Sequence, residues 1–128
     1  MASILVVDDD AFMQELIQFT LEVEGHRVTV ASDGEQALAR LERESFELML
    51  VDLYMPVMDG IRFLTEVSRR VPDPPRAIVL SGSAEAALRQ QVRDLGAYDL
   101  IRKPIGVSEL KARLEDALTA PRTGEHGA

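Results

Sequence analysis

The chain has 128 residues, of which 46% are hydrophobic, and this fits one compact domain with a single core. The formal net charge of −8 at pH 7 argues against DNA or an anionic membrane as a direct partner, because either would need a basic surface. Since the chain has no cysteine, no leader-like N-terminus and no apolar run of membrane length, we expect a cytoplasmic domain without disulfides.

Short apolar runs alternate with amphipathic, helix-like patterns along the chain. The expected strands cover residues 4–7, 27–31, 48–52, 77–80 and 99–102. Between and after them, apolar residues recur at helical spacing, and the expected helices begin at Asp10, Ser32, Asp59, about Ala84 and Ser108. Ser32 is chosen as a helix start because Glu35 follows it at the spacing of a capping box.

This alternation predicts an α/β fold, a doubly wound parallel sheet of five strands with five helices on its two faces. In this interpretation residues 1–120 form the domain, and the polar residues 121–128 form a frayed tail. The run from Leu48 to Asp52 is apolar until its final acid, as expected for a strand buried on both faces. Asp52 therefore falls at the carboxyl edge of the sheet, where open α/β folds bind ligands.

Polar side chains of complementary chemistry stand at the ends of four predicted strands. Asp8 and Asp9 follow the first strand, Asp52 ends the third, Ser81 follows the fourth and Lys103 follows the fifth. Three neighbouring carboxylates repel one another, and a divalent cation relieves that repulsion. Because the donors are hard oxygens and no soft ligand set for zinc is present, we expect Mg²⁺, with Mn²⁺ as a substitute.

These groups suit the handling of a phosphoryl group, which depends mainly on positioning and charge neutralisation. Asp52 would be the nucleophile that forms an acyl phosphate, with Ser81 as a hydroxyl donor and Lys103 as a point charge for the anion. Each signal taken singly has a structural alternative, since Asp52 could cap a turn and acids are common before a helix. The hypothesis depends on the joint pattern.

The chain resembles the receiver domain of two-component response regulators from about Ser3 to Leu118. The resemblance is carried by residues 4–10 (ILVVDDD), 33–38 (DGEQAL), 51–60 (VDLYMPVMDG), 80–82 (LSG) and 102–104 (RKP). It implies a flavodoxin-like strand order of 2-1-3-4-5. It also implies a phosphorylation-dependent switch that takes phosphate from a sensor histidine kinase or a histidine phosphotransfer domain and acts on an unknown downstream protein, as a monomer or a phosphorylation-dependent homodimer.

The resemblance also assigns roles to individual residues. Asp52 is implied as the phosphoacceptor, Asp9 as the main carboxylate ligand of Mg²⁺, and Asp8 as a ligand that acts largely through water. The backbone carbonyl of Tyr54 would complete the protein ligands. Ser81 would bind a phosphoryl oxygen, and Lys103 would bridge the phosphoryl group to the acids. The bond between Lys103 and Pro104 is expected to be cis.

Two positions depart from the usual family pattern. Leu100 stands three residues before Lys103, where members that switch by an aromatic rotamer carry Tyr or Phe, and leucine cannot make the hydroxyl contact of a tyrosine. Tyr98 lies two residues before Leu100 and is expected on the same face of the strand, where we interpret it as a packing residue. Tyr54 stands two residues after Asp52, where its phenol would shield an acyl phosphate from water.

Some residues and functions keep two interpretations. Phe12 either contacts a partner histidine domain or broadens the buried face of its helix. Arg89, Gln90 and Arg93 form a polar face that either binds an output partner or is simply solvated.

A phosphorylation-independent interaction module is one alternative function, but such a module would be expected to lack Asp52, Asp9 or Lys103. An Asp-nucleophile phosphohydrolase is another, but it needs a second acid where Tyr54 stands. We therefore expect no enzyme acting on an external substrate, only self-phosphorylation from a donor and slow autodephosphorylation.

Overall fold

The computed structural model describes residues 2–55 and 57–121, and all of the predicted tail except Pro121 lies outside them. Over these residues the strands are β1 (Ser3–Val7), β2 (Arg27–Ala31), β3 (Leu48–Asp52), β4 (Arg76–Ser81) and β5 (Ala97–Arg102). The helices are α1 (Ala11–Val23), α2 (Gly34–Arg43), α3 (Gly60–Arg70), α4 (Ala86–Asp94) and α5 (Val107–Thr119). The strands form one parallel sheet in the order β2-β1-β3-β4-β5, which confirms the predicted fold.

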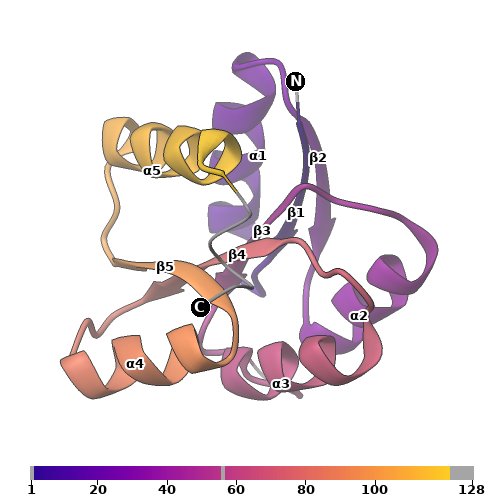
Figure 1. The fold of residues 1–128 in the computed structure, drawn as a ribbon. Coiled ribbons are helices and arrows are strands. Elements are labelled where there is room, and N and C mark those ends of the chain that lie inside the picture. The colour runs from indigo at the N-terminus through magenta and orange to yellow at the C-terminus, as the bar shows by residue number, and fades with distance from the viewer. Residues whose placement is uncertain (1, 56, 122–128) are drawn as a thin grey trace.

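The helices form two layers around this sheet. Helices α1 and α5 cover one face, and α2, α3 and α4 cover the other (Figure 1). Each layer has its own core cluster of buried side chains. The central strand β3 contributes to both clusters, and each of its five residues is buried. This explains why its sequence is apolar throughout rather than alternating.

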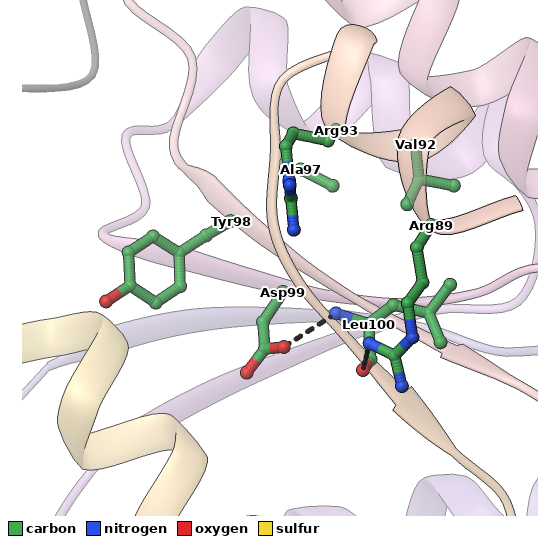
Figure 2. A pocket seen from close by; sticks show the side chains of 7 residues that line it. All are labelled: Arg89, Val92, Arg93, Ala97, Tyr98, Asp99 and Leu100. Atoms are coloured by element: carbon green, nitrogen blue, oxygen red, sulfur yellow. Dashed lines mark hydrogen bonds between the residues drawn. The ribbon is translucent and has the colours of Figure 1, made fainter. Parts of the chain in front are cut away.

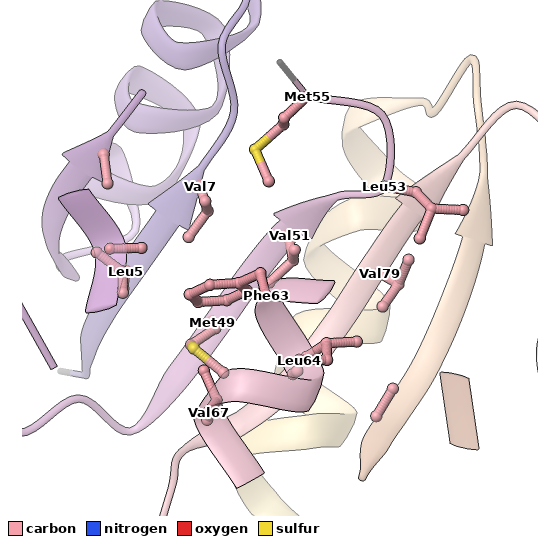
Figure 3. Close-up of a cluster of buried hydrophobic side chains, with 14 of the residues drawn as sticks. Leu5, Val7, Met49, Val51, Leu53, Met55, Phe63, Leu64, Val67 and Val79 are labelled. Atoms are coloured by element: carbon pink, nitrogen blue, oxygen red, sulfur yellow. The ribbon is translucent and has the colours of Figure 1, made fainter. Parts of the chain in front are cut away.

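Helix α3 packs against the sheet beside β3, and it begins next to the carboxyl end of that strand. Phe63, Leu64 and Val67 share one side of this helix and pack into the same cluster as Met49 and Val51 (Figure 3). Phe63 is fully buried, and burial of such a side chain stabilises the fold by about 1.5–3 kcal/mol. This packing fixes α3, and with it the loop that follows Asp52.

The start of α3 approaches the backbone of that loop closely. Gly60 donates its N–H to the carbonyl of Leu53 at 2.7 Å. A Cβ atom at position 60 would lie 2.8 Å from Leu53 Cα and 3.0 Å from the Asp52 carbonyl oxygen. A glycine is therefore required here for steric reasons, because the helix start lies directly against the segment that carries Asp52.

Helix starts agree with the sequence predictions in two cases. The Asp10 carboxylate accepts hydrogen bonds from the N–H groups of Phe12 and Met13, and the Asp59 carboxylate accepts one from Arg62. Both acids are therefore N-caps, as predicted for Asp10, and Asp59 stands where the third helix was predicted to begin.

The other helix starts differ. The predicted cap at Ser32 is wrong, because Asp33 accepts the Gln36 N–H at 2.8 Å while the Ser32 N–H donates to the Gln36 side chain. Ser108 is also not a cap, since it lies inside α5 after Gly106. Helix α4 begins at Ala86, two residues later than expected.

Tyr98 packs as predicted, but on the other side of the sheet from Leu100. The register between β4 and β5 shifts so that Ala77 pairs with Ala97 and Ile78 with Asp99, which leaves Tyr98 as an inserted residue. Such a bulge reverses the alternation of side chains. Tyr98 therefore packs in the layer of α1 and α5, where its hydroxyl donates to Asp116 at 2.8 Å.

Helices long and apolar enough to cross a bilayer do not occur among the residues that the structure describes.

Candidate functional site

Three acids meet at the carboxyl edge of the sheet. Strands β1 and β3 are neighbours with Val7 paired to Val51, so the residues that follow them lie side by side. Asp8, Asp9 and Asp52 each offer a carboxylate oxygen, and these atoms lie within 4.8 Å of one another. Asp8 and Asp52 are buried, with 1% and 5% exposure, whereas Asp9 is exposed. The predicted cluster of acids is therefore formed, with one member open to solvent.

The Asp8 carboxylate is incompletely satisfied. Its Oδ1 accepts the Asp10 N–H at 2.9 Å, whereas its buried Oδ2 has no hydrogen-bond partner among the described residues. Burial raises the pKa of Asp8 above its usual value; the hydrogen bond from Asp10 opposes this rise, and the charge of Asp52 adds to it. A buried carboxylate oxygen without a donor suits a hard cation, so these residues fit Mg²⁺.

Lys103 and Ser81 complete the edge beside Asp52. The Lys103 ammonium donates to Asp52 Oδ1 at 2.9 Å. Ser81 is fully buried, and its Oγ accepts the N–H of Ser83 at 3.1 Å, which leaves the hydroxyl proton for another acceptor. The Lys103 N–H donates to the Ser81 carbonyl at 2.7 Å, so the backbone holds the two residues together. The Lys103–Pro104 bond is cis, as expected.

The two atypical residues lie in different environments. Tyr54 is 67% exposed in the loop after Asp52, whereas Leu100 is 3% exposed and packs in the cluster that contains Val79 and Val92. The Leu100 side chain therefore points into the core of the domain. Phe12 is 70% exposed, so the interpretation that it broadens the buried face of α1 is wrong.

Gln14 is a residue of the site to which the sequence analysis gave no role. Its Nε2 donates to the backbone carbonyl of Asp8 and, at 3.2 Å, to Ser32 Oγ. It thereby ties the loop after β1, which carries the acids, to the loop after β2. An amide one turn into the helix that follows an acidic strand end is the signal that would have pointed to it.

This arrangement has the parts that phosphoryl chemistry needs. The Asp52 carboxylate adjoins acids that fit a divalent cation, the Lys103 ammonium and the Ser81 hydroxyl. Positioning and charge neutralisation of this kind account for most of the catalysis of phosphoryl transfer.

Comparison with known proteins identifies relatives over most of the chain. The family model described as "Response regulator receiver domain" matches residues 4–115. The transcriptional regulatory protein CpxR of Klebsiella pneumoniae is 40% identical over 118 residues, which cover 92% of this chain and 50% of that protein. The CpxR homolog of Haemophilus influenzae is 39% identical, with 92% and 51% covered. The chain thus spans about half the length of these curated relatives.

Solved structures agree with this assignment. The chemotaxis protein CheY4 of Vibrio cholerae superposes with a TM-score of 0.86 at 28% identity, over 92% of this chain and 99% of that one. The receiver domain of NtrX from Brucella abortus superposes with a TM-score of 0.83 at 30% identity, again over 92% and 99%. The chain therefore belongs to the family of response regulator receiver domains of two-component signalling systems.

Proposed function

We propose that Asp52 takes a phosphoryl group from a phosphohistidine and that this modification switches the protein-binding properties of the domain. The observation that carries the proposal is the contact of 2.9 Å between Asp52 Oδ1 and Lys103 Nζ within a group of three acids. In the transfer, an Asp52 oxygen attacks phosphorus while the bond from phosphorus to the histidine nitrogen breaks. The donor imidazole, protonated at its other nitrogen, leaves as the neutral ring.

The residues around Asp52 have separate tasks in this scheme. Asp8, Asp9, Asp52 and the backbone carbonyl of Tyr54 would hold Mg²⁺, or Mn²⁺ in its place, with Asp9 as the main ligand and Asp8 acting largely through water. When bound, the cation neutralises charge on the acids and on the transferred group. The Lys103 ammonium and the Ser81 hydroxyl bind phosphoryl oxygens.

The donor is a sensor histidine kinase or a histidine phosphotransfer domain, and the exposed side of α1 supports a helical partner. Phe12, Leu16, Phe19 and Val23 are 70%, 39%, 70% and 63% exposed. Their spacing of four, three and four residues places them on one stripe, the pattern by which helices pack against each other. The stripe begins two residues after Asp10, beside the acids.

The chemistry is confined to the domain's own phosphorylation and slow dephosphorylation. Tyr54 stands where Asp-nucleophile phosphohydrolases carry the acid that protonates a leaving group, so turnover of an external substrate is not proposed. The net charge of −8 disfavours nucleic acid and anionic membrane as direct partners, and we place the domain in the cytoplasm. Its output is a protein contact, as a monomer or as a phosphorylation-dependent homodimer.

Intact mass spectrometry tests the proposal. The wild type is incubated with acetyl phosphate and Mg²⁺, alongside Asp52→Ala and a sample with excess chelator. One phosphoryl adduct is expected in the wild type and none in either control. A folded protein that binds Mg²⁺ yet takes no adduct would instead favour the phosphorylation-independent module. An adduct that persists in Asp52→Ala would place the acceptor elsewhere.

A further inference from the structure

Arg89 links α4 to two separate backbone segments. Its side chain reaches from the helix across a shallow pocket to the backbone of β5 (Figure 2). Its Nη1 donates to the Leu100 carbonyl at 3.2 Å, and its Nε donates to the Ala84 carbonyl at 3.2 Å. One half-buried guanidinium thus connects the loop before α4 to the last strand of the sheet.

The two segments are those that carry Ser81 and Lys103. Ala84 lies three residues after Ser81, and Leu100 lies three residues before Lys103. The backbone bond from Lys103 to the Ser81 carbonyl joins the segments at the site itself. Arg89 joins them a second time, farther from the acids. Two connections restrict the relative motion of the segments more than one does.

The surroundings of Arg89 favour this connecting role over an ion pair. Asp99 also lines the pocket, but its Oδ2 accepts from Arg113 at 2.6 Å. β5 is an edge strand, so its outer carbonyls have no neighbouring strand to donate to them, and Arg89 supplies a donor to Leu100. The Leu100 side chain is apolar and buried, so this residue forms hydrogen bonds only through its backbone: its N–H donates to Asp99 Oδ1 at 2.9 Å, and its carbonyl accepts from Arg89.

We propose that Arg89 is a positioning residue that keeps Ser81 and Lys103 at the separation needed to bind one phosphoryl group. This inference rests on the proposed function of Asp52. The hydrogen bonds of Arg89 go to the Ala84 and Leu100 carbonyls and not to Asp8, Asp9 or Asp52, so it acts through the backbone of the two segments. Lysine cannot replace it fully, because a single ammonium lacks the planar fork that reaches two carbonyls at once.

The test compares Arg89→Met, Arg89→Lys and the matched control Arg93→Met. Arg93 lines the same pocket from one turn farther along α4, and its substitution removes the same charge. For each folded variant, the rate of Asp52 phosphorylation by acetyl phosphate is measured by intact mass, and Mg²⁺ affinity by calorimetry. Hydrogen exchange of the amides of residues 82–85 is measured as a readout independent of phosphorylation.

We expect Arg89→Met to lower the phosphorylation rate roughly fivefold through loss of positioning, with Arg89→Lys in between. Arg93→Met should match the wild type, and Mg²⁺ affinity should be unchanged in all variants. Exchange at residues 82–85 should be faster in Arg89→Met. A wild-type rate in Arg89→Met, or an equal loss in Arg93→Met, would overturn the inference. If the wild type itself takes no phosphoryl group, the proposed function fails, and hydrogen exchange alone then tests the link that Arg89 makes between the two segments. Unchanged exchange at residues 82–85 in Arg89→Met would overturn that link, and faster exchange would support it.

Discussion

The Nζ atom of Lys103 lies 2.9 Å from Oδ1 of Asp52, although 51 residues separate the two in sequence. The Asp52 side chain is 6% exposed and that of Lys103 is 31% exposed, so the pair opens to solvent on the lysine side. The ammonium thus stands where it can move from the carboxylate to a phosphoryl oxygen without crossing the protein interior. Its contribution can be separated from that of the cation site.

Lys103→Met is expected to lower the rate of Asp52 phosphorylation by about 100-fold, the scale of losing one preorganised charge. The same change should raise Mg²⁺ affinity, because it removes a positive charge beside the acids. Intact mass and calorimetry measure the two effects. Lys111→Met is the control, since Lys111 pairs with Glu24 away from the site. A fall in Mg²⁺ affinity in Lys103→Met would contradict this separation of roles.

Asp8→Asn is expected to stabilise the metal-free protein at neutral pH. The pKa of Asp8 is raised in the folded state, mainly by burial, so the folded state binds this proton more tightly than the unfolded state does. Its contribution to stability is therefore present below the ordinary Asp range and is lost as the pH rises through the raised value. The variant should gain on the order of 1 kcal/mol in the free energy of unfolding at pH 7.

Urea unfolding across a pH series measures this gain, which should vanish in acid. Saturating Mg²⁺ should stabilise the wild type more than Asp8→Asn, because a ligand stabilises the state that binds it. Asp94→Asn, which changes the same charge on α4, serves as the control. If Asp8→Asn is less stable than the wild type without metal, the ionised Asp8 carboxylate must stabilise the folded state, and the prediction is wrong.

The sheet and the polar residues at its carboxyl edge were predictable because both follow from the pattern of strands along the chain. The strands β1, β3 and β4 are marked by short apolar runs and β2 by alternation around Val28 and Val30, and in a parallel sheet the residues at the carboxyl ends of the strands converge at one edge. The grouping of Asp8, Asp52, Ser81 and Lys103 at this edge could therefore be predicted from the sequence alone. The N-cap of α2 could not be assigned, because Ser32 and Asp33 are adjacent candidates and only backbone geometry selects Asp33.

Features that depend on side-chain reach or on local irregularity were not predictable. The side of the sheet taken by Tyr98 follows from a bulge in β5, which leaves no mark in the alternation of residues. Gln14 and Arg89 both bond backbone carbonyls outside their own helix turns, and no spacing rule identifies such partners. Arg89 belongs to the polar face that the sequence predicted on the fourth helix. Its side chain is not simply solvated, because it donates to two backbone carbonyls of the domain itself.

Phe19→Ser is expected to slow phosphorylation by a histidine kinase that acts on the wild type, by roughly tenfold, as for a residue near the centre of a helix interface. Phe19 is 70% exposed, so its loss should leave the fold intact. The rate with acetyl phosphate serves as an internal control and should not change, because a small donor needs no helix contact. An equal loss with both donors would show damage to the site rather than to docking.

Val57→Asn is expected to raise the free energy of unfolding by about 1 kcal/mol, because Val57 has φ = 69° and a β-branched residue in the left-handed region is strained. Its side chain is 69% exposed, so little burial is lost on substitution. Chemical denaturation measures the change. Val107→Asn, at an exposed position in α5, should not stabilise the protein. Equal effects at both positions would rule out strain as the cause.

Tyr54→Asn is expected to shorten the lifetime of the phosphorylated protein several-fold. Tyr54 lies two residues after Asp52 in the loop at the carboxyl edge and is 67% exposed, so its ring can cover an acyl phosphate on the solvent side. Excluding water from a reactive intermediate slows its hydrolysis. The decay of the adduct is followed by intact mass after removal of the donor, with Mg²⁺ present. Tyr98→Phe, which alters the chain's other tyrosine on the far side of β5, should decay at the wild-type rate. Identical decay in Tyr54→Asn and the wild type would show that water reaches the phosphoryl group by a path that the phenol does not cover.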